Sequence, residues 1–166
     1  MVKVILLGPM GAGKSTLGKI LSRELQWPYF DNDLEITTSY GLNEEEVSQL
    51  AVEELHALET RYLRDVLTRP DSFISGAAAS VIDNEENRIL LNSVFSVYLR
   101  LPIEKIIERA GISGVGRQVL QSAGTDILIE RFNRRDPLYT TVSKLVVELS
   151  DSPDKDAEII KKALLS

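Results

Sequence analysis

A glycine-rich loop directly after an apolar run constrains the fold of this chain more than any other part of its sequence. Residues 2–7 are mostly apolar and predict a buried strand, and residues 8–15, GPMGAGKS, match the pattern GxxxxGK followed by Ser or Thr. Apolar residues then recur at the spacing of one helix face: Leu17, Ile20, Leu21 and Leu25. A strand, a glycine-rich turn and a helix in this order predict a loop that binds phosphate at the positive end of the helix. A chance resemblance to such a loop is the alternative, which the order of the elements disfavours.

The residues of this loop have distinct chemical uses. Lys14 can reach the β and γ phosphates of a nucleotide, and the Ser15 hydroxyl suits Mg²⁺. The glycines allow successive backbone N–H groups to turn toward the phosphates. We therefore expect the nucleotide to be bound by Gly11, Ala12, Gly13, Lys14, Ser15 and Thr16.

Composition indicates one compact, acidic domain. A chain of 166 residues that is 43% hydrophobic can bury a single sizeable core. Its formal net charge of −6 argues against a general nucleic-acid surface, and it has no cysteine for disulfides or thiolate metal sites. The apolar run near the amino terminus is too short for a signal peptide, and no stretch reaches membrane-spanning length. We expect a cytoplasmic monomer that acts on a small-molecule substrate, without nucleic-acid or membrane partners.

Apolar segments alternate along the chain with segments of helical periodicity. The strand candidates are residues 2–7, 27–30, 72–75, 94–99 and 145–149. This alternation predicts an α/β fold in which a parallel sheet lies between two layers of helices. Helix starts are indicated at Asn43 with Glu46, at Asp83 with Glu86, and at Asp151 and Ser152 before Pro153.

Two segments interrupt this alternation. Residues 43–67 are mostly helical and lie where a simple crossover would be shorter, so we expect a substrate-binding insertion there. Residues 110–124 contain glycines at 111, 114, 116 and 124 around a single Arg117, which favours a lid that closes over the site.

Four features together resemble those of the shikimate kinases, a P-loop family related to the nucleoside monophosphate kinases. They are the phosphate loop, the pair Asp31 and Asp33 after the second strand, Arg117, and residues 135–139, RDPLY. The resemblance spans almost the whole chain. It implies a three-layer α/β/α P-loop kinase fold with a five-stranded, mostly parallel sheet, the helical insertion and the lid. It also implies a kinase of aromatic amino acid biosynthesis that uses ATP and Mg²⁺ to convert shikimate to shikimate 3-phosphate.

The resemblance assigns roles to two carboxylates and two arginines. Asp31 would help to hold Mg²⁺ through water, and Asp33 would bind the acceptor hydroxyls. Arg117 would reach the transferring phosphates from the lid, and Arg109 would bind ATP by lying against the adenine. The residues alone leave alternatives open, because paired carboxylates after a strand can also cap a helix and Arg109 can be a solvent-facing charge.

The acceptor side departs from the family pattern. Arg135 matches the family's arginine for the shikimate carboxylate, with a structural ion pair as the alternative. Alignment of the family pattern GExxFRxxE on Glu59 places His56 where a second arginine is expected, so His56 is either a weaker, pH-dependent donor or an ordinary helix-surface histidine.

The family's GGG turn after the third strand reads AAA here, which predicts a pocket of different shape or a different turn. The expected acceptor-binding residues are Asp33, His56, Ala77, Ala78, Ala79 and Arg135.

Three functions are consistent with these residues. The first is transfer of the γ-phosphoryl group of ATP to a hydroxyl, with Lys14 and Arg117 stabilising the phosphoryl charge and Asp33 orienting or deprotonating the hydroxyl. Shikimate is the first-choice acceptor for this reaction. The second function is the same transfer to another hydroxylated metabolite or to a nucleoside. The third is a nucleotide-binding regulatory protein with weak ATPase activity, against which the intact paired carboxylates and lid arginine argue.

Overall fold

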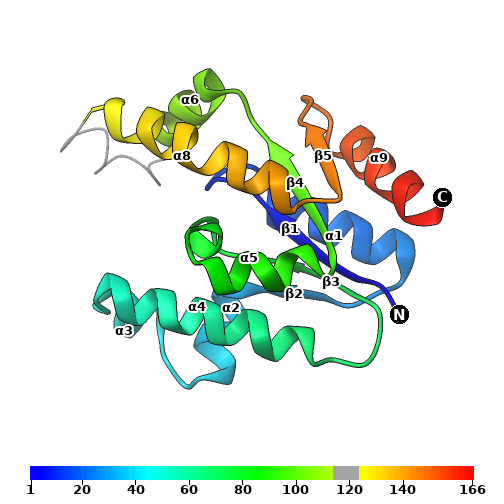
Figure 1. Cartoon of the computed structure of the whole chain (residues 1–166), viewed down its shortest axis with the longest axis horizontal. Helices are drawn as coiled ribbons and strands as arrows, with labels where there is room; N and C mark the ends of the chain where they lie inside the picture. Colours follow the sequence, from blue (N-terminus) through cyan, green and yellow to red (C-terminus); the bar gives the residue numbers. More distant parts are fainter. Residues whose placement is uncertain (114–123) are drawn as a thin grey trace.

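A parallel β-sheet forms the centre of the molecule, whose computed structural model describes residues 1–113 and 124–166 (Figure 1). Within those residues the sheet has five strands in the order β2-β3-β1-β4-β5. The strands are β1 (Lys3–Leu7), β2 (Tyr29–Asp31), β3 (Phe73–Gly76), β4 (Phe95–Arg100) and β5 (Leu145–Glu148). Each pairing between these neighbours is parallel, so the strands all end at the same edge of the sheet. The predicted strands are confirmed, although β2 begins and ends later than the apolar run indicated.

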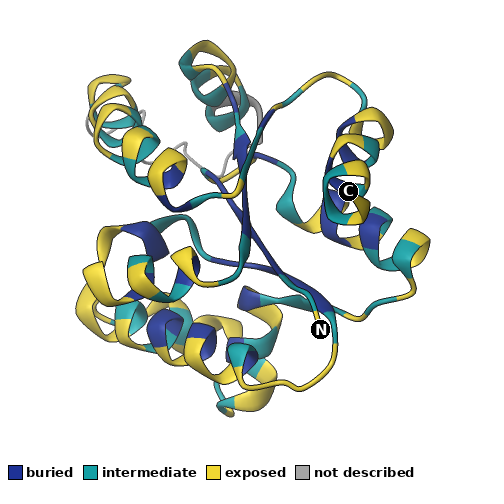
Figure 2. Ribbon diagram, turned by 45° about the vertical axis from the view of Figure 1, so that its right-hand side comes forward, coloured by how far each residue is buried: buried dark blue, intermediate teal, exposed yellow. Residues whose placement is uncertain are grey.

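The hydrophobic core lies on both faces of this sheet. Side chains alternate along β1, so that Val4 and Leu6 join one buried cluster while Ile5 and Leu7 join the other. Because β1 is buried on both faces, its sequence is a continuous apolar run rather than an alternation of apolar and polar residues. Figure 2 shows the buried strands at the centre and the exposed residues on the outward sides of the helices.

Helices cover both faces and give the three predicted layers. They are α1 (Lys14–Leu25), α2 (Asn32–Ser39), α3 (Glu44–Ser48), α4 (Val52–Leu67), the 3₁₀ turn η1 (Ala79–Asp83), α5 (Glu85–Asn92), α6 (Ile103–Ser113), α8 (Asp126–Val142) and α9 (Pro153–Leu165). Helices α1 and α9 pack together on the face that carries Val4 and Leu6. Helices α4, α5 and α8 supply Tyr62, Leu91 and Tyr139 to the cluster on the opposite face.

Local sequence signals correctly predict the start of two helices. Asn43 and Glu46 form a reciprocal capping box at α3. The Ser152 side chain caps α9, and Pro153 occupies its first turn, where a missing N–H costs nothing.

The start of α5 differs from the prediction by one residue. Asn84, rather than Asp83, accepts a hydrogen bond from the backbone N–H of Glu86, at 2.8 Å. Asp83 is the last residue of η1, and its carboxylate instead forms an ion pair with Arg135 of α8. The predicted cap was wrong because a long-range partner competes for this side chain.

Two segments, residues 43–67 and 110–124, were predicted to interrupt the alternation of strands and helices, and the structure describes only the first of them in full. The insertion at residues 43–67 consists of α3 and α4, and α2 packs against α4; Figure 1 shows these helices along the lower side of the molecule. Of the predicted lid, residues 110–113 complete α6, while residues 114–123, including Arg117, lie outside the described residues. The roles predicted for the lid and for Arg117 therefore stay predictions. In the described ranges no helix is long and apolar enough to cross a membrane.

Candidate active site

The phosphate loop connects β1 to α1 at the edge where the strands end. Gly8, Gly11 and Gly13 have φ values of 152°, 82° and 90°, a region that L side chains rarely adopt. A Cβ on Gly8 would also lie 2.8 Å from the carbonyl oxygen of Leu99 on β4. Among the described residues no side chain caps α1, and its first turn holds no acidic residue. The free N–H groups at its positive end therefore suit an anion such as a phosphate.

The Lys14 side chain folds back over this loop. Its Nζ donates hydrogen bonds to the carbonyl oxygens of Gly8, at 2.7 Å, and Pro9, at 3.2 Å. Burial lowers the pKa of Lys14 to about 8, although the nearby Asp33 and Asp31 act in the opposite direction. A bound phosphate would stabilise the charged form that burial disfavours, so Lys14 is suited to bind an anion in the loop.

Asp31 combines two contacts in one carboxylate. Its Oδ1 caps α2 by accepting hydrogen bonds from the backbone N–H groups of Asp33, at 3.0 Å, and Leu34, at 3.3 Å. Its Oδ2 accepts a hydrogen bond from the Ser15 hydroxyl at 2.8 Å. Helix capping, which the sequence left open as an alternative, is therefore present together with the contact to the phosphate loop.

The pair of Ser15 and Asp31 has the chemistry that Mg²⁺ requires. This cation binds oxygen ligands, uses few protein groups and completes its shell with water and phosphate oxygens. In the part of the chain that the structure describes, no group of three or more His, Cys, Asp or Glu side chains could hold a metal ion alone. The residues present thus fit a metal that is shared with a nucleotide rather than one held in a protein cage.

Asp33 lies in the first turn of α2 with an exposed side chain. Its charge opposes the lowering of the Lys14 pKa and contributes to the raising of the Glu59 pKa. Asp33 therefore lies near enough to both the phosphate loop and α4 to act electrostatically on each.

The three alanines after β3 form a turn that requires no glycine. Ala78 has φ −62° and ψ 147°, and Ala79 begins η1. None of the three alanines has a positive φ, since among the described residues Gln26 is the one non-glycine residue that has it. Ala77 is buried, and the carbonyl oxygen of Ala79 accepts a hydrogen bond of 2.6 Å from the hydroxyl of Tyr139, which fastens the turn to α8.

Arg135 is paired within the protein. Its Nε and Nη2 donate hydrogen bonds to the two carboxylate oxygens of Asp83, at 3.1 and 2.8 Å, and its side chain is 15% exposed. Burial tends to lower the pKa of Arg135, but the hydrogen bonds to Asp83 together with the electrostatic effects of Tyr139, Asp83 and Glu59 outweigh burial, and the pKa is raised. The ion pair that the sequence left open is thus present, on the arginine expected to receive the acceptor carboxylate.

Glu59 of α4 is a buried acidic residue for which the sequence predicted no role. This residue is 8% exposed and accepts a hydrogen bond from the Ser80 hydroxyl at 2.7 Å. Burial raises its pKa, and the Ser80 hydrogen bond opposes the shift. His56 lies one turn earlier on α4 and lines the same small pocket as Glu59, Ser80 and Asp83. The spacing of His56 and Glu59, which puts both on one helix face, is the signal that could have found it.

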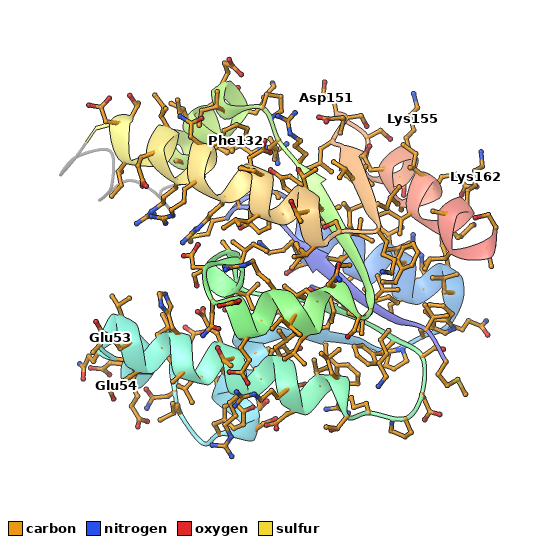
Figure 3. All side chains as sticks on the ribbon, viewed as in Figure 1. Glu53, Glu54, Phe132, Asp151, Lys155 and Lys162 are labelled. Atoms are coloured by element: carbon orange, nitrogen blue, oxygen red, sulfur yellow. The ribbon has the colours of Figure 1, made fainter. Side chains whose placement is uncertain are left out.

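Arg109 extends from α6 onto the phosphate loop, where its Nη1 donates to the Gly11 carbonyl oxygen at 2.5 Å. A largely apolar cavity lies between this loop, α6 and α8, and reaches Arg135; Tyr98, Ile106 and Phe132 are among its lining residues. Figure 3 labels Phe132 on α8. The apolar surface of the cavity suits a flat ring, and its position connects the phosphate loop with Arg135.

Comparisons with known proteins show the family to which this chain belongs. The family model for shikimate kinase matches residues 10–165. A shikimate kinase of Chromohalobacter salexigens is 35% identical over 146 residues, which cover 87% of this chain and 81% of that protein. A shikimate kinase of Neisseria gonorrhoeae is 29% identical over 162 residues, which cover 96% of this chain and 95% of that protein.

A solved structure gives the same result for the fold. The shikimate kinase from Acinetobacter baumannii, in complex with shikimate, superimposes with a TM-score of 0.85 at 27% identity, and the match covers 99% of this chain and 93% of that one. The predicted resemblance is confirmed. The chain belongs to the shikimate kinase family, whose members are phosphotransferases that act on a hydroxyl group.

Proposed function

We propose that this chain is itself a shikimate kinase, which transfers the γ-phosphoryl group of ATP to a hydroxyl of shikimate. The observation that best supports this is the phosphate loop in which Lys14 and the Ser15–Asp31 pair lie close to the acidic Asp33. The name of the relatives and the shikimate bound to the Acinetobacter baumannii enzyme support shikimate as the acceptor. A monomeric state and a cytoplasmic location stay predictions of the sequence.

The residues divide the chemistry between the two substrates. The N–H groups at the start of α1 and the Lys14 ammonium would bind the phosphates and offset negative charge on the transferring group. Asp33 would orient the acceptor hydroxyl and take its proton as the oxygen attacks phosphorus and the bond to ADP breaks. Arg117 would add a second positive charge, and Arg109 would contact the nucleotide.

Ser15 would hold Mg²⁺ directly and Asp31 would hold it through water. When bound, Mg²⁺ would supply positive charge to the β and γ phosphates. Because Oδ1 of Asp31 caps α2, only its Oδ2 remains for the metal side, and Ser15 would exchange its hydrogen bond to this oxygen for the metal.

The test is ADP formation in a coupled assay with shikimate, with no acceptor, and with a panel of hydroxylated metabolites and nucleosides. We expect saturable turnover with shikimate that Lys14→Ala abolishes. Lys162→Ala removes an exposed lysine from α9 and is the matched control, expected to keep its activity. ATP hydrolysis that ignores every acceptor would contradict the proposal and favour a regulatory protein.

A kinase for a hydroxylated acceptor without a carboxylate is the second candidate. It is supported by the Asp83–Arg135 pair and by His56 at the position of the family's second arginine. Faster turnover of a neutral acceptor than of shikimate in the same panel would select it.

A further inference from the structure

The end of η1 places a carboxylate of the protein on the acceptor arginine. Both oxygens of Asp83 accept hydrogen bonds from one edge of the Arg135 guanidinium, Nε and Nη2, at 3.1 and 2.8 Å. Arg134 adds a longer contact of 3.8 Å to the same carboxylate. This two-point geometry is the one by which a guanidinium binds any carboxylate, including that of a substrate. Asp83 therefore makes the contacts that an acceptor carboxylate would make at this edge.

The paired guanidinium faces the cleft rather than the outer surface. Arg135 lines the apolar cavity together with Pro9 of the phosphate loop and Ala79 of the alanine turn. Its charge also acts on Lys14 of the phosphate loop and on Glu59 of α4. Asp83 does not line this cavity but lines the small pocket with His56 and Glu59, so an acceptor that reaches Arg135 from that pocket meets the carboxylate already bound there.

The surroundings make a second carboxylate unfavourable at this position. Among the described residues, Asp33, Glu59 and Asp83 are acidic groups on the acceptor side, and His56, Arg134 and Arg135 are basic groups there. One carboxylate already neutralises Arg135, so an incoming carboxylate meets less attraction and more repulsion than at an unpaired arginine. It must displace Asp83 or accept hydrogen bonds only from the remaining N–H groups.

We propose that Asp83 determines acceptor specificity in this chain: it competes with the acceptor's carboxylate for Arg135 and so lowers the affinity for anionic acceptors. The inference rests on the proposed function, because it concerns the acceptor site of that reaction. Asp83 acts through Arg135 and is a positioning residue, not a catalytic one.

Asp83 can be replaced without loss of the elements around it. It caps no helix, since Asn84 caps α5, and its side chain is 28% exposed. The turn η1 is held separately by the Tyr139 hydroxyl, which donates to the Ala79 carbonyl, and by Arg88, which donates to the Ile82 carbonyl at 2.8 Å. The variant Asp83→Asn keeps the size of the side chain and removes its charge.

The test compares Asp83→Asn with the unmodified protein in shikimate titrations by calorimetry and in steady-state kinetics. We expect the Kd and the KM for shikimate to fall about 5-fold or more, a typical coupling between neighbouring groups, while kcat and the KM for MgATP change little. The methyl ester of shikimate has no carboxylate charge, so its KM should not respond to the substitution.

Two further variants separate competition from a structural effect. Glu130→Gln removes a charge of the same sign from α8, where Glu130 pairs with Arg134 at 3.1 Å, and it should leave the shikimate KM unchanged. In an Arg135→Gln background, Asp83→Asn should not change the Kd or the KM for shikimate further, because the guanidinium for which Asp83 and the acceptor compete is absent.

The outcomes distinguish this inference from the proposed function. Tighter shikimate binding by Asp83→Asn without turnover in either protein would support the competition and overturn the activity. Normal shikimate turnover with unchanged or weaker binding by Asp83→Asn would overturn the competition and leave the activity standing. Failure of Asp83→Asn to bind shikimate at all would also overturn the competition, and an equal gain for the methyl ester would do the same.

Discussion

At the scale of single residues, Lys14 makes nucleotide binding depend on pH. Burial lowers its pKa to about 8, so it loses its charge in the free protein above that pH. Bound phosphate favours the charged form, and binding above pH about 8 must therefore take up a proton. We expect the Kd for MgATP to be flat below this pH and to rise above it, by up to about tenfold per pH unit.

Calorimetry in two buffers of different ionisation enthalpy measures both the Kd and the proton uptake. Lys14→Met should bind weakly and lose the pH dependence. A Kd that stays constant across this range, with no proton uptake, would show that Lys14 keeps its charge in the free protein.

The two contacts of Asp31 can be separated by substitution. Asparagine is as good a helix cap as aspartate, so Asp31→Asn should keep the stability of α2 within about 0.5 kcal/mol, whereas Asp31→Ala should lose about 1 kcal/mol. Both variants lose the charge beside Ser15, and we expect both to need more Mg²⁺ for half-maximal turnover. Urea unfolding measures the change in stability, and a Mg²⁺ titration of activity measures the change in Mg²⁺ requirement. An unchanged Mg²⁺ requirement in Asp31→Asn would show that Asp31 caps α2 but does not help to bind Mg²⁺.

At the scale of elements, the contact between α1 and β2 depends on the absence of a side chain. A Cβ on Gly18 would overlap the ring of Tyr29, whose hydroxyl lies 3.4 Å from Asp31. Helix propensity alone predicts that Gly18→Ala stabilises α1 by about 1 kcal/mol. Overpacking of a core contact costs about 1 to 3 kcal/mol, so we expect a net loss.

Denaturant unfolding of Gly18→Ala measures this balance. Arg23→Ala changes an exposed position of the same helix and should alter the free energy of unfolding by less than about 0.5 kcal/mol. A stabilised Gly18→Ala would show that Tyr29 moves aside without cost.

At the scale of the whole molecule, the features predicted correctly depend on residues that are close in sequence. The phosphate loop, the Asn43 capping box and the Ser152 cap each depend on a few successive residues. Continuous apolar runs predicted the strands because parallel strands are buried on both faces. The order of the strands in the sheet, however, does not follow from such periodicities.

The contacts that the sequence did not predict join distant segments. Asp83 and Arg135 are 52 residues apart, and their pairing requires η1 to meet α8 across the sheet edge. Because the Asp83 carboxylate pairs with Arg135, Asn84 rather than Asp83 caps α5. The contact of Glu59 was not predicted because the hydrogen bond from Ser80 joins α4 to η1 across 21 residues of sequence.

The most direct test of the proposed activity is mass spectrometry of shikimate after incubation with the protein and MgATP. We expect a product heavier by one phosphoryl group, formed in a 1:1 ratio to ADP and absent with Lys14→Ala. Unmodified shikimate in the presence of ADP formation would contradict it, because the phosphoryl group would then have passed to water or to another acceptor.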